Sequence, residues 1–85
     1  MYMRCQLIVL NYMRDDDILK AFGKHLRELR EKTDLSQEGL AELADVHRTY
    51  EGMMERGRAN PTLLAIVALA RALKVRPSKL LQKLR

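Results

Sequence analysis

The segment from Leu35 to Met54 constrains the fold of this chain more than any other part of the sequence. Ser36 is a favourable N-cap, because its hydroxyl can accept a hydrogen bond from a free N–H group in the first turn of a helix. Small and apolar residues then recur at helical spacing, namely Leu40, Ala41 and Ala44. Asp45 follows where the chain must turn, and a second short helix begins near His47. The pattern predicts two short amphipathic helices joined by a tight turn.

Helical periodicity continues through most of the remaining chain. The expected helices cover residues 15–33, 36–44, 47–56 and 62–73, with a fifth that begins at Pro77. An apolar stripe predicts the buried face of the first helix, and its charged residues, Arg30 among them, are expected outside. Gly57 is suited to the position after the third helix, because it can adopt a positive φ. The expected fold is therefore all-α, with five short helices.

The charge of the chain is distributed unevenly. The formal net charge is +5, yet all 11 acidic residues lie between Asp15 and Glu55. The region from Arg56 to Arg85 holds eight Arg or Lys residues and no acid. One-sided positive charge attracts a polyanion, although a run of Lys and Arg can also be only a solvated face. Together with two short helices at a fixed angle, the charge favours nucleic acid, with one helix presented to the major groove of DNA.

Size and composition narrow the class of protein. A chain of 85 residues fits one domain with a small core, for which a dimer interface would help. The single cysteine, Cys5, excludes an internal disulfide framework and is typical of the reducing cytoplasm. No apolar run reaches the ~18–20 residues of a membrane helix, so we expect no membrane partner. Two isolated histidines and no Gly-rich phosphate loop predict no metal site, no cofactor and no enzyme activity.

Residues 1–14 differ from the rest of the sequence. Their short apolar run, 7–10, is compatible with a strand, an arm that packs on a partner, or frayed chain. We expect residues 1–14 to form an N-terminal extension or arm upstream of the helical domain at 15–85, with the helix-turn-helix at about 35–54.

Several segments carry a resemblance to a known family. They read Phe-Gly-Lys-His-Leu-Arg-Glu-Leu-Arg at 22–30, Leu-Ser-Gln-Glu at 35–38, Val-His-Arg-Thr-Tyr at 46–50, Glu-Arg-Gly at 55–57, Asn-Pro-Thr-Leu at 60–63 and Ala-Arg-Ala-Leu at 70–73. In this order and spacing, from about Ile18 to Leu84, the chain resembles the Xre/Cro/C1-type helix-turn-helix family of phage repressors and bacterial regulators. The short length and two of the segments, His-Arg-Thr-Tyr and Glu-Arg-Gly, are similar to restriction–modification controllers. The resemblance implies a five-helix λ-repressor-like DNA-binding domain.

The resemblance also implies a set of DNA contacts. Gln37 would bond a backbone phosphate, and Arg48 and Thr49 would face base edges, since Arg can bond guanine O6 and N7 and Thr offers a hydroxyl and a methyl group. Met53 would make an apolar contact one turn on. The remaining expected contacts are His47, Tyr50, Arg56, Arg58 and Asn60.

Several of these residues could instead make contacts within the chain. Gln37 can fold back on the start of its helix, and Tyr50 can belong to the core. Arg56 can pair with Glu55 or Glu51 instead of DNA. His47 suits a helix cap better than a base contact.

Three positions depart from the family pattern. Asp45 replaces a turn Gly but tolerates a left-handed conformation. Gly39 stands where a Glu completes the capping box with Ser36. Glu51 stands where the family has Ile or Val facing the core, and an unpartnered carboxylate there would cost several kcal/mol. Glu51 must then find a cation or a hydroxyl, or its helix must rotate or loosen, or the chain is a weakened variant.

The expected function is that of a sequence-specific transcriptional regulator that binds a palindromic operator as a homodimer. Excess apolar surface on the last two helices predicts the dimer face, with these residues: Leu64, Ala65, Ala68, Leu80, Leu81 and Leu84. The alternative is an antitoxin-type or other interaction module that binds a toxin or another protein. The expected location is the cytoplasm, for a bacterial or phage protein associated with the nucleoid.

Overall fold

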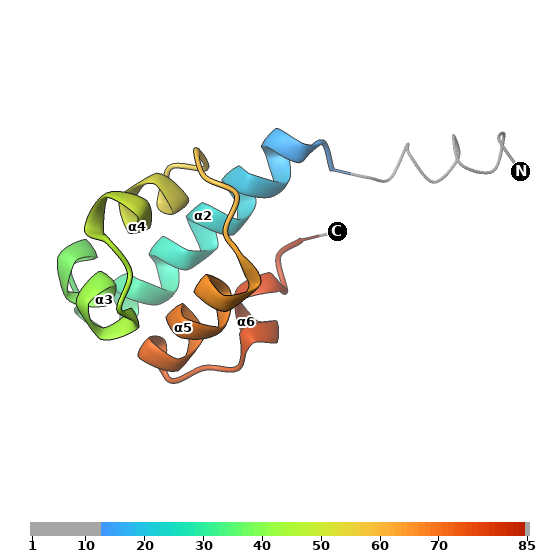
Figure 1. Ribbon diagram of the computed structural model, residues 1–85. Coiled ribbons are helices and arrows are strands. Elements are labelled where there is room, and N and C mark those ends of the chain that lie inside the picture. Colours follow the sequence, from blue (N-terminus) through green and yellow to red (C-terminus); the bar gives the residue numbers. More distant parts are fainter. Residues whose placement is uncertain (1–12, 85) are drawn as a thin grey trace, which may run out of the picture.

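Five helices make up most of residues 13–84, the part of the chain that this computed structural model describes (Figure 1). They are α2 Asp15–Lys32, α3 Gln37–Ala44, α4 Arg48–Glu55, α5 Leu63–Leu73 and α6 Pro77–Leu81. The all-α expectation is confirmed, and each helix begins within two residues of its predicted start. The expected arm falls outside the described residues except for Met13 and Arg14.

Local capping fixes the helix starts. The N–H of Gly39 donates to Ser36 Oγ at 2.9 Å, and the N–H of Thr49 donates to His47 Nδ1 at 3.1 Å. At the start of α5, Thr62 Oγ1 accepts from Ala65 N–H at 3.0 Å. These side chains satisfy N–H groups that have no partner inside the helix. The predicted Ser36 cap is therefore confirmed, and His47 caps α4, the role that suited it better than a base contact.

Two left-handed residues end the helices of the motif. Asp45, with φ of 56°, closes α3, and Gly57, with φ of 72°, follows α4. A side chain on Gly57 would also approach the Lys20 backbone, since an added Cβ would lie 2.9 Å from the Lys20 Cα. Asp45 therefore adopts the left-handed conformation expected of it at this turn.

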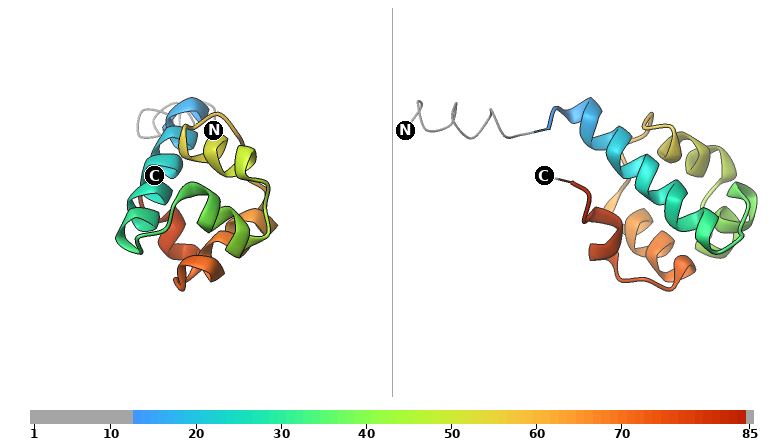
Figure 2. Two further views of the ribbon diagram at one scale, coloured as in Figure 1. Left: turned by 90° about the vertical axis from the view of Figure 1, so that its left-hand side faces the viewer. Right: turned by 180° about the vertical axis from the view of Figure 1, so that it is seen from behind.

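The helices enclose one core. α2 packs on α4 and α6, α3 packs on α4 and α5, and α5 packs on α6, which Figure 2 shows from two further sides. The buried apolar residues of this core are Phe22, Leu26, Leu29, Leu40, Ala44, Met54, Ala65, Leu69, Ala70, Leu73 and Leu80. Among residues 13–84, every helix is too short or too polar to cross a lipid bilayer.

The core includes two residues that the sequence assigned to the dimer face. Leu80 is fully buried and Ala65 is 6% exposed, so neither can meet a partner, and their assignment was wrong. The reason is the position of α6, which lies against α2 and α5 and is held there by a 2.7 Å hydrogen bond between His25 Nε2 and the carbonyl oxygen of Lys79. Ala68 and Leu84 also pack against this core, so of the six residues assigned to the dimer face two, Leu64 and Leu81, are exposed.

Candidate DNA interface

The helix-turn-helix presents several of the expected contact residues on its surface. Arg48 and Thr49 are exposed in the first turn of α4, and Met53, one turn further, is half-buried. Arg56 directly follows the helix and is also exposed. Arg58 and Asn60 are exposed in the loop between α4 and α5. These side chains are therefore available to a ligand.

A depression of ≈ 250 Å³ lies between the starts of α3 and α4. Its lining residues are Gln37, Glu38, Arg48, Thr49, Gly52 and Arg56. Gly52 leaves room for its neighbours, because an added Cβ would lie 3.1 Å from Arg56 Nη1 and 3.6 Å from Gln37 Oε1. The amide of Gln37 and the guanidinium of Arg56 thus lie close together over the Gly52 backbone.

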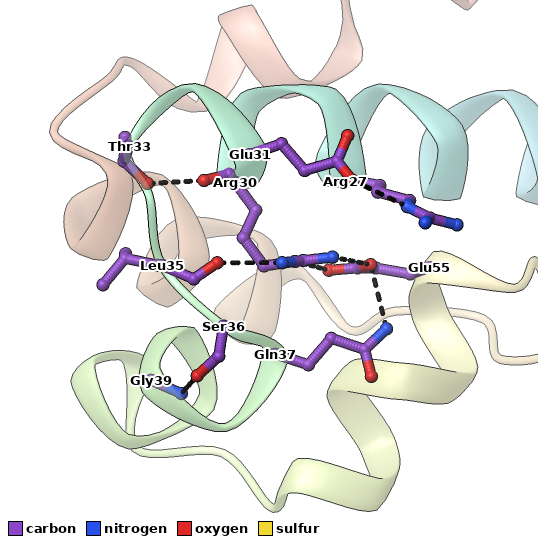
Figure 3. A network of polar contacts seen from close by, with 9 residues as sticks. All are labelled: Arg27, Arg30, Glu31, Thr33, Leu35, Ser36, Gln37, Gly39 and Glu55. Carbon is purple, nitrogen blue, oxygen red and sulfur yellow. Dashed lines mark hydrogen bonds and ion pairs between the residues drawn. The ribbon is translucent and has the colours of Figure 1, made fainter.

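A buried ion pair between Arg30 and Glu55 lies next to Gln37, which lines this depression (Figure 3). Arg30 Nε donates to Glu55 Oε2 at 2.6 Å, and Arg30 Nη2 donates to Glu55 Oε1 at 3.1 Å. The third nitrogen, Nη1, donates to the Leu35 carbonyl oxygen at 2.8 Å. This arrangement is bidentate, the strong form of an Arg–carboxylate contact. It ties α2 to the end of α4 and to the segment that leads into α3.

Gln37 belongs to the same network. Its Nε2 donates to Glu55 Oε1 at 3.0 Å, so the amide is oriented by α4 and does not fold back on the start of α3 (Figure 3). Since an amide nitrogen carries two hydrogens, one N–H remains for a ligand. The expectation that Arg30 points outward was wrong, because a hydrogen bond at each of its three side-chain nitrogens compensates the burial of its charge.

The two glutamates of α4 have opposite electrostatic environments. Burial alone would raise the pKa of Glu55, but hydrogen bonds from Arg30 and Gln37 lower this pKa below its ordinary value. Glu51 has no exposed surface, and neither carboxyl oxygen makes a hydrogen bond to any described residue. Burial, and next the neighbouring Glu55 carboxylate, raise the pKa of Glu51 to about 9. At neutral pH the buried Glu51 is therefore protonated and uncharged.

Protonation resolves the question that Glu51 raised in the sequence. Neither a cation nor a hydroxyl hydrogen-bonds its carboxyl group within residues 13–84, and α4 runs unbroken from Arg48 to Glu55. Of the three alternatives, a hydrogen-bonded cation or hydroxyl and a loosened helix are therefore not found among residues 13–84. The weakened variant stays a prediction. Because the side chain of Glu51 is protonated, α4 avoids the cost of burying an ion.

Tyr50 and Arg56 also occupy defined positions at this surface. The hydroxyl oxygen of Tyr50 accepts from the N–H of Thr62 at 3.1 Å, and its ring packs against the core. The hydroxyl hydrogen is still free to donate, so packing and a phosphate contact are compatible. Arg56 forms no ion pair with Glu51 or Glu55 among the described residues.

Sequence reasoning missed one residue at this surface. Glu38 Oε1 accepts a hydrogen bond of 2.7 Å from Arg48 Nη1, across the turn between α3 and α4. The two residues are ten positions apart, which is no helical repeat, so no local pattern indicates the pair. It becomes visible only when the angle between α3 and α4 is known.

Comparison with known proteins defines the class. The family described as helix-turn-helix domain matches residues 21–83, and the chain belongs to this family. Control protein C.SmaI of Serratia marcescens is 42% identical over 67 residues, which cover 79% of this chain and 80% of that protein. Control protein C.BamHI of Bacillus amyloliquefaciens is 42% identical over 67 residues, with 78% and 83% covered.

A solved structure gives the same result. The restriction-modification controller protein C.AhdI from Aeromonas hydrophila is 48% identical, with a TM-score of 0.72. The match covers 73% of this chain and 94% of that one. The chain is a DNA-binding transcriptional regulator of the Xre/Cro/C1-type helix-turn-helix class.

Proposed function

We propose that the chain is a sequence-specific regulator that binds a near-palindromic operator as a homodimer. The observation that carries the proposal is the exposed first turn of α4, where Arg48 and Thr49 stand on a helix that is anchored on its inner side by Met54 and Glu55. A guanidinium can bond guanine O6 and N7 together, and a threonine can contact thymine through its methyl group. Arg48 and Thr49 are therefore the base-reading residues.

Backbone phosphates are the proposed ligands of the depression between α3 and α4. Ser36 uses its hydroxyl and its carbonyl oxygen on the N–H groups of Gly39 and Leu40. The N–H groups of Gln37 and Glu38 at the same helix start remain for an anion, which the helix dipole also favours. The free amide hydrogen of Gln37 and the guanidinium of Arg56 add side-chain donors. These groups fix the position of α4 in the groove without reading sequence.

The dimer face is proposed around the exposed leucines of α5 and α6. Leu63 and Leu64 are 72% and 80% exposed. Covering these two side chains with a partner would lower the free energy, because it removes apolar surface from water. Leu81 is exposed on α6. Two copies related by a two-fold axis would place their α4 helices in successive major grooves, about 34 Å apart. The regulator would act on the nucleoid, in the bacterial cytoplasm.

Selection of bound duplexes from a random pool, at a stated salt concentration, tests the proposal. We expect a near-palindrome with half-sites one helical turn apart. R48A should lose preference at one base of each half-site at a cost of ~1–3 kcal/mol, whereas Q37A should weaken all duplexes alike. A pool without a preferred sequence, or an R48A protein with unchanged preference, contradicts the proposal.

A further inference from the structure

The candidate base-reading arginine is already bound within the chain. Arg48 Nη1 donates to Glu38 Oε1 at 2.7 Å, and their side chains are 67% and 69% exposed. Glu38 is the only acid among the six residues that line the depression between α3 and α4, beside two arginines. The bond occupies one terminal nitrogen of Arg48 and leaves its other donors for a base. A carboxylate on a DNA-facing surface opposes DNA binding unless it has a specific role there.

We propose that Glu38 is a specificity-determining residue that orients Arg48 and offsets its charge, so that Arg48 distinguishes guanine from phosphate. The inference rests on the proposed function, since it requires that Arg48 reads bases. Glu38 itself is a positioning residue, because it acts on the base through Arg48.

The physical argument concerns non-cognate DNA. On a non-cognate duplex a free arginine contacts phosphate and gains affinity there, because each phosphate that it neutralises releases counterions. The Glu38–Arg48 pair carries no net charge, so it gains little from phosphates alone. Guanine offers Arg48 two hydrogen-bond acceptors in a fixed geometry. A guanidinium that is already oriented can donate to both acceptors with little further loss of side-chain conformational entropy. Glu38 thus lowers the affinity of the protein for non-cognate DNA more than its affinity for the operator. A negative side chain that faces the negative DNA can contribute specificity in this way.

The test compares E38Q with the wild-type protein on the selected operator and on a scrambled duplex, over a series of salt concentrations. E42Q is the matched control, because Glu42 is exposed on the same helix α3. For E38Q on the scrambled duplex, the slope of log K against log salt should steepen by ~0.9 relative to the wild-type protein. If the two proteins bind equally at 1 M salt, E38Q then binds roughly eightfold more tightly than the wild-type protein at 0.1 M salt. Operator affinity should change by less than about threefold, the scale of an exposed ion pair. The ratio of the two affinities therefore falls in E38Q and is retained in E42Q.

A second background isolates the contribution of Arg48. In R48A, the further change E38Q should shift the operator and the scrambled duplex equally, because no arginine remains to be positioned. A side-chain NMR measurement of Arg48 Nε–H in the free protein, without DNA, should show more motion in E38Q than in E42Q.

Three results would overturn the inference: an unchanged ratio in E38Q, an equal loss in E42Q, or Arg48 motion that E38Q does not alter. If the wild-type protein prefers its operator while one of these results is found, only the role of Glu38 fails. If the wild-type protein has no preferred sequence, the proposed function fails as well.

Discussion

Replacing Glu51 by valine should stabilise the protein strongly, and by an amount that depends on pH. Glu51 is fully buried in the middle of α4, and its carboxyl group has no hydrogen-bond partner among the described residues. Its pKa is about 9 in the folded chain against an ordinary value of 4.5. Between these two pH values the folded protein holds a proton that the unfolded chain releases. Folding then requires proton uptake, so stability falls as pH rises.

The magnitude follows from that difference. Each pH unit above 4.5 costs about 1.4 kcal/mol, so at pH 7 the ionisation of Glu51 destabilises the fold by about 3 kcal/mol. Valine also removes the cost of burying an unpartnered polar group, ~1–3 kcal/mol, against a loss of ~0.5 kcal/mol in helix propensity. A net gain of roughly 4 kcal/mol at pH 7 corresponds to a Tm increase on the order of 15 °C or more. At pH 5 the ionisation part shrinks to below ~1 kcal/mol.

Urea unfolding at several pH values between 5 and 8.5 measures this dependence. E51Q separates the two contributions, because the amide removes the titration but keeps a buried polar group. E42V is the control at an exposed glutamate of α3. Glu55 has the opposite pH dependence: its pKa is lowered, so its stabilisation is present above the ordinary pKa and is lost only as pH falls further. Parallel stability profiles for wild-type and E51V proteins, or a less stable E51V protein, would refute the reasoning.

Three further predictions follow from the packing. G23A should destabilise the protein by ~2 kcal/mol or more in urea unfolding, because the Cβ of the new alanine would lie 2.5 Å from the carbonyl oxygen of Glu55. A change within ~0.5 kcal/mol would show that α2 and α4 separate easily. R30M keeps an apolar stem but leaves Glu55 buried and unpaired, so a loss of about 3–5 kcal/mol is expected from thermal unfolding, and a neutral effect would contradict the role given to this pair. L64S should weaken dimerisation at least about tenfold in sedimentation equilibrium and leave the Tm of the monomer unchanged. The control L43S, at a leucine of α3 that is 61% exposed, should leave dimerisation unchanged. Equal weakening of dimerisation in L64S and L43S would show that α5 is not part of the interface.

Local chemistry made the helix boundaries predictable. Ser36 and Gly57 act on backbone groups within three residues of themselves, so their roles can be read without knowing the fold. The exposed start of α4 followed from the same boundaries, since a cap at His47 leaves Arg48 and Thr49 in the first turn. The family resemblance supplied the DNA contacts, and these stay predictions.

Contacts between distant segments were not predictable in this way. Arg30 and Glu55 are 25 positions apart, and a helical pattern can only sort Arg30 by its charge, which places it outside. Leu80 shows the same limit: an apolar residue on the last helix fits its own core and a partner's surface equally well until the position of α6 is known. The sequence could identify Glu51 as anomalous, but whether it ionises depends on burial by other helices.

The order of α4 must come from its surroundings, not from its own sequence. A helix of eight residues is unstable alone, and Gly52 lowers its propensity by roughly 1 kcal/mol relative to alanine. Contacts hold it along its length, because His47 caps its start, Tyr50 joins it to the start of α5, and Glu55 is clamped by Arg30. The clamp at Glu55 also holds Gln37, so the residue proposed for phosphate contact and the helix proposed for base contact are fixed by one buried carboxylate. A chain that carries an uncharged acid and a glycine at the centre of α4 can therefore still present that helix in a single orientation.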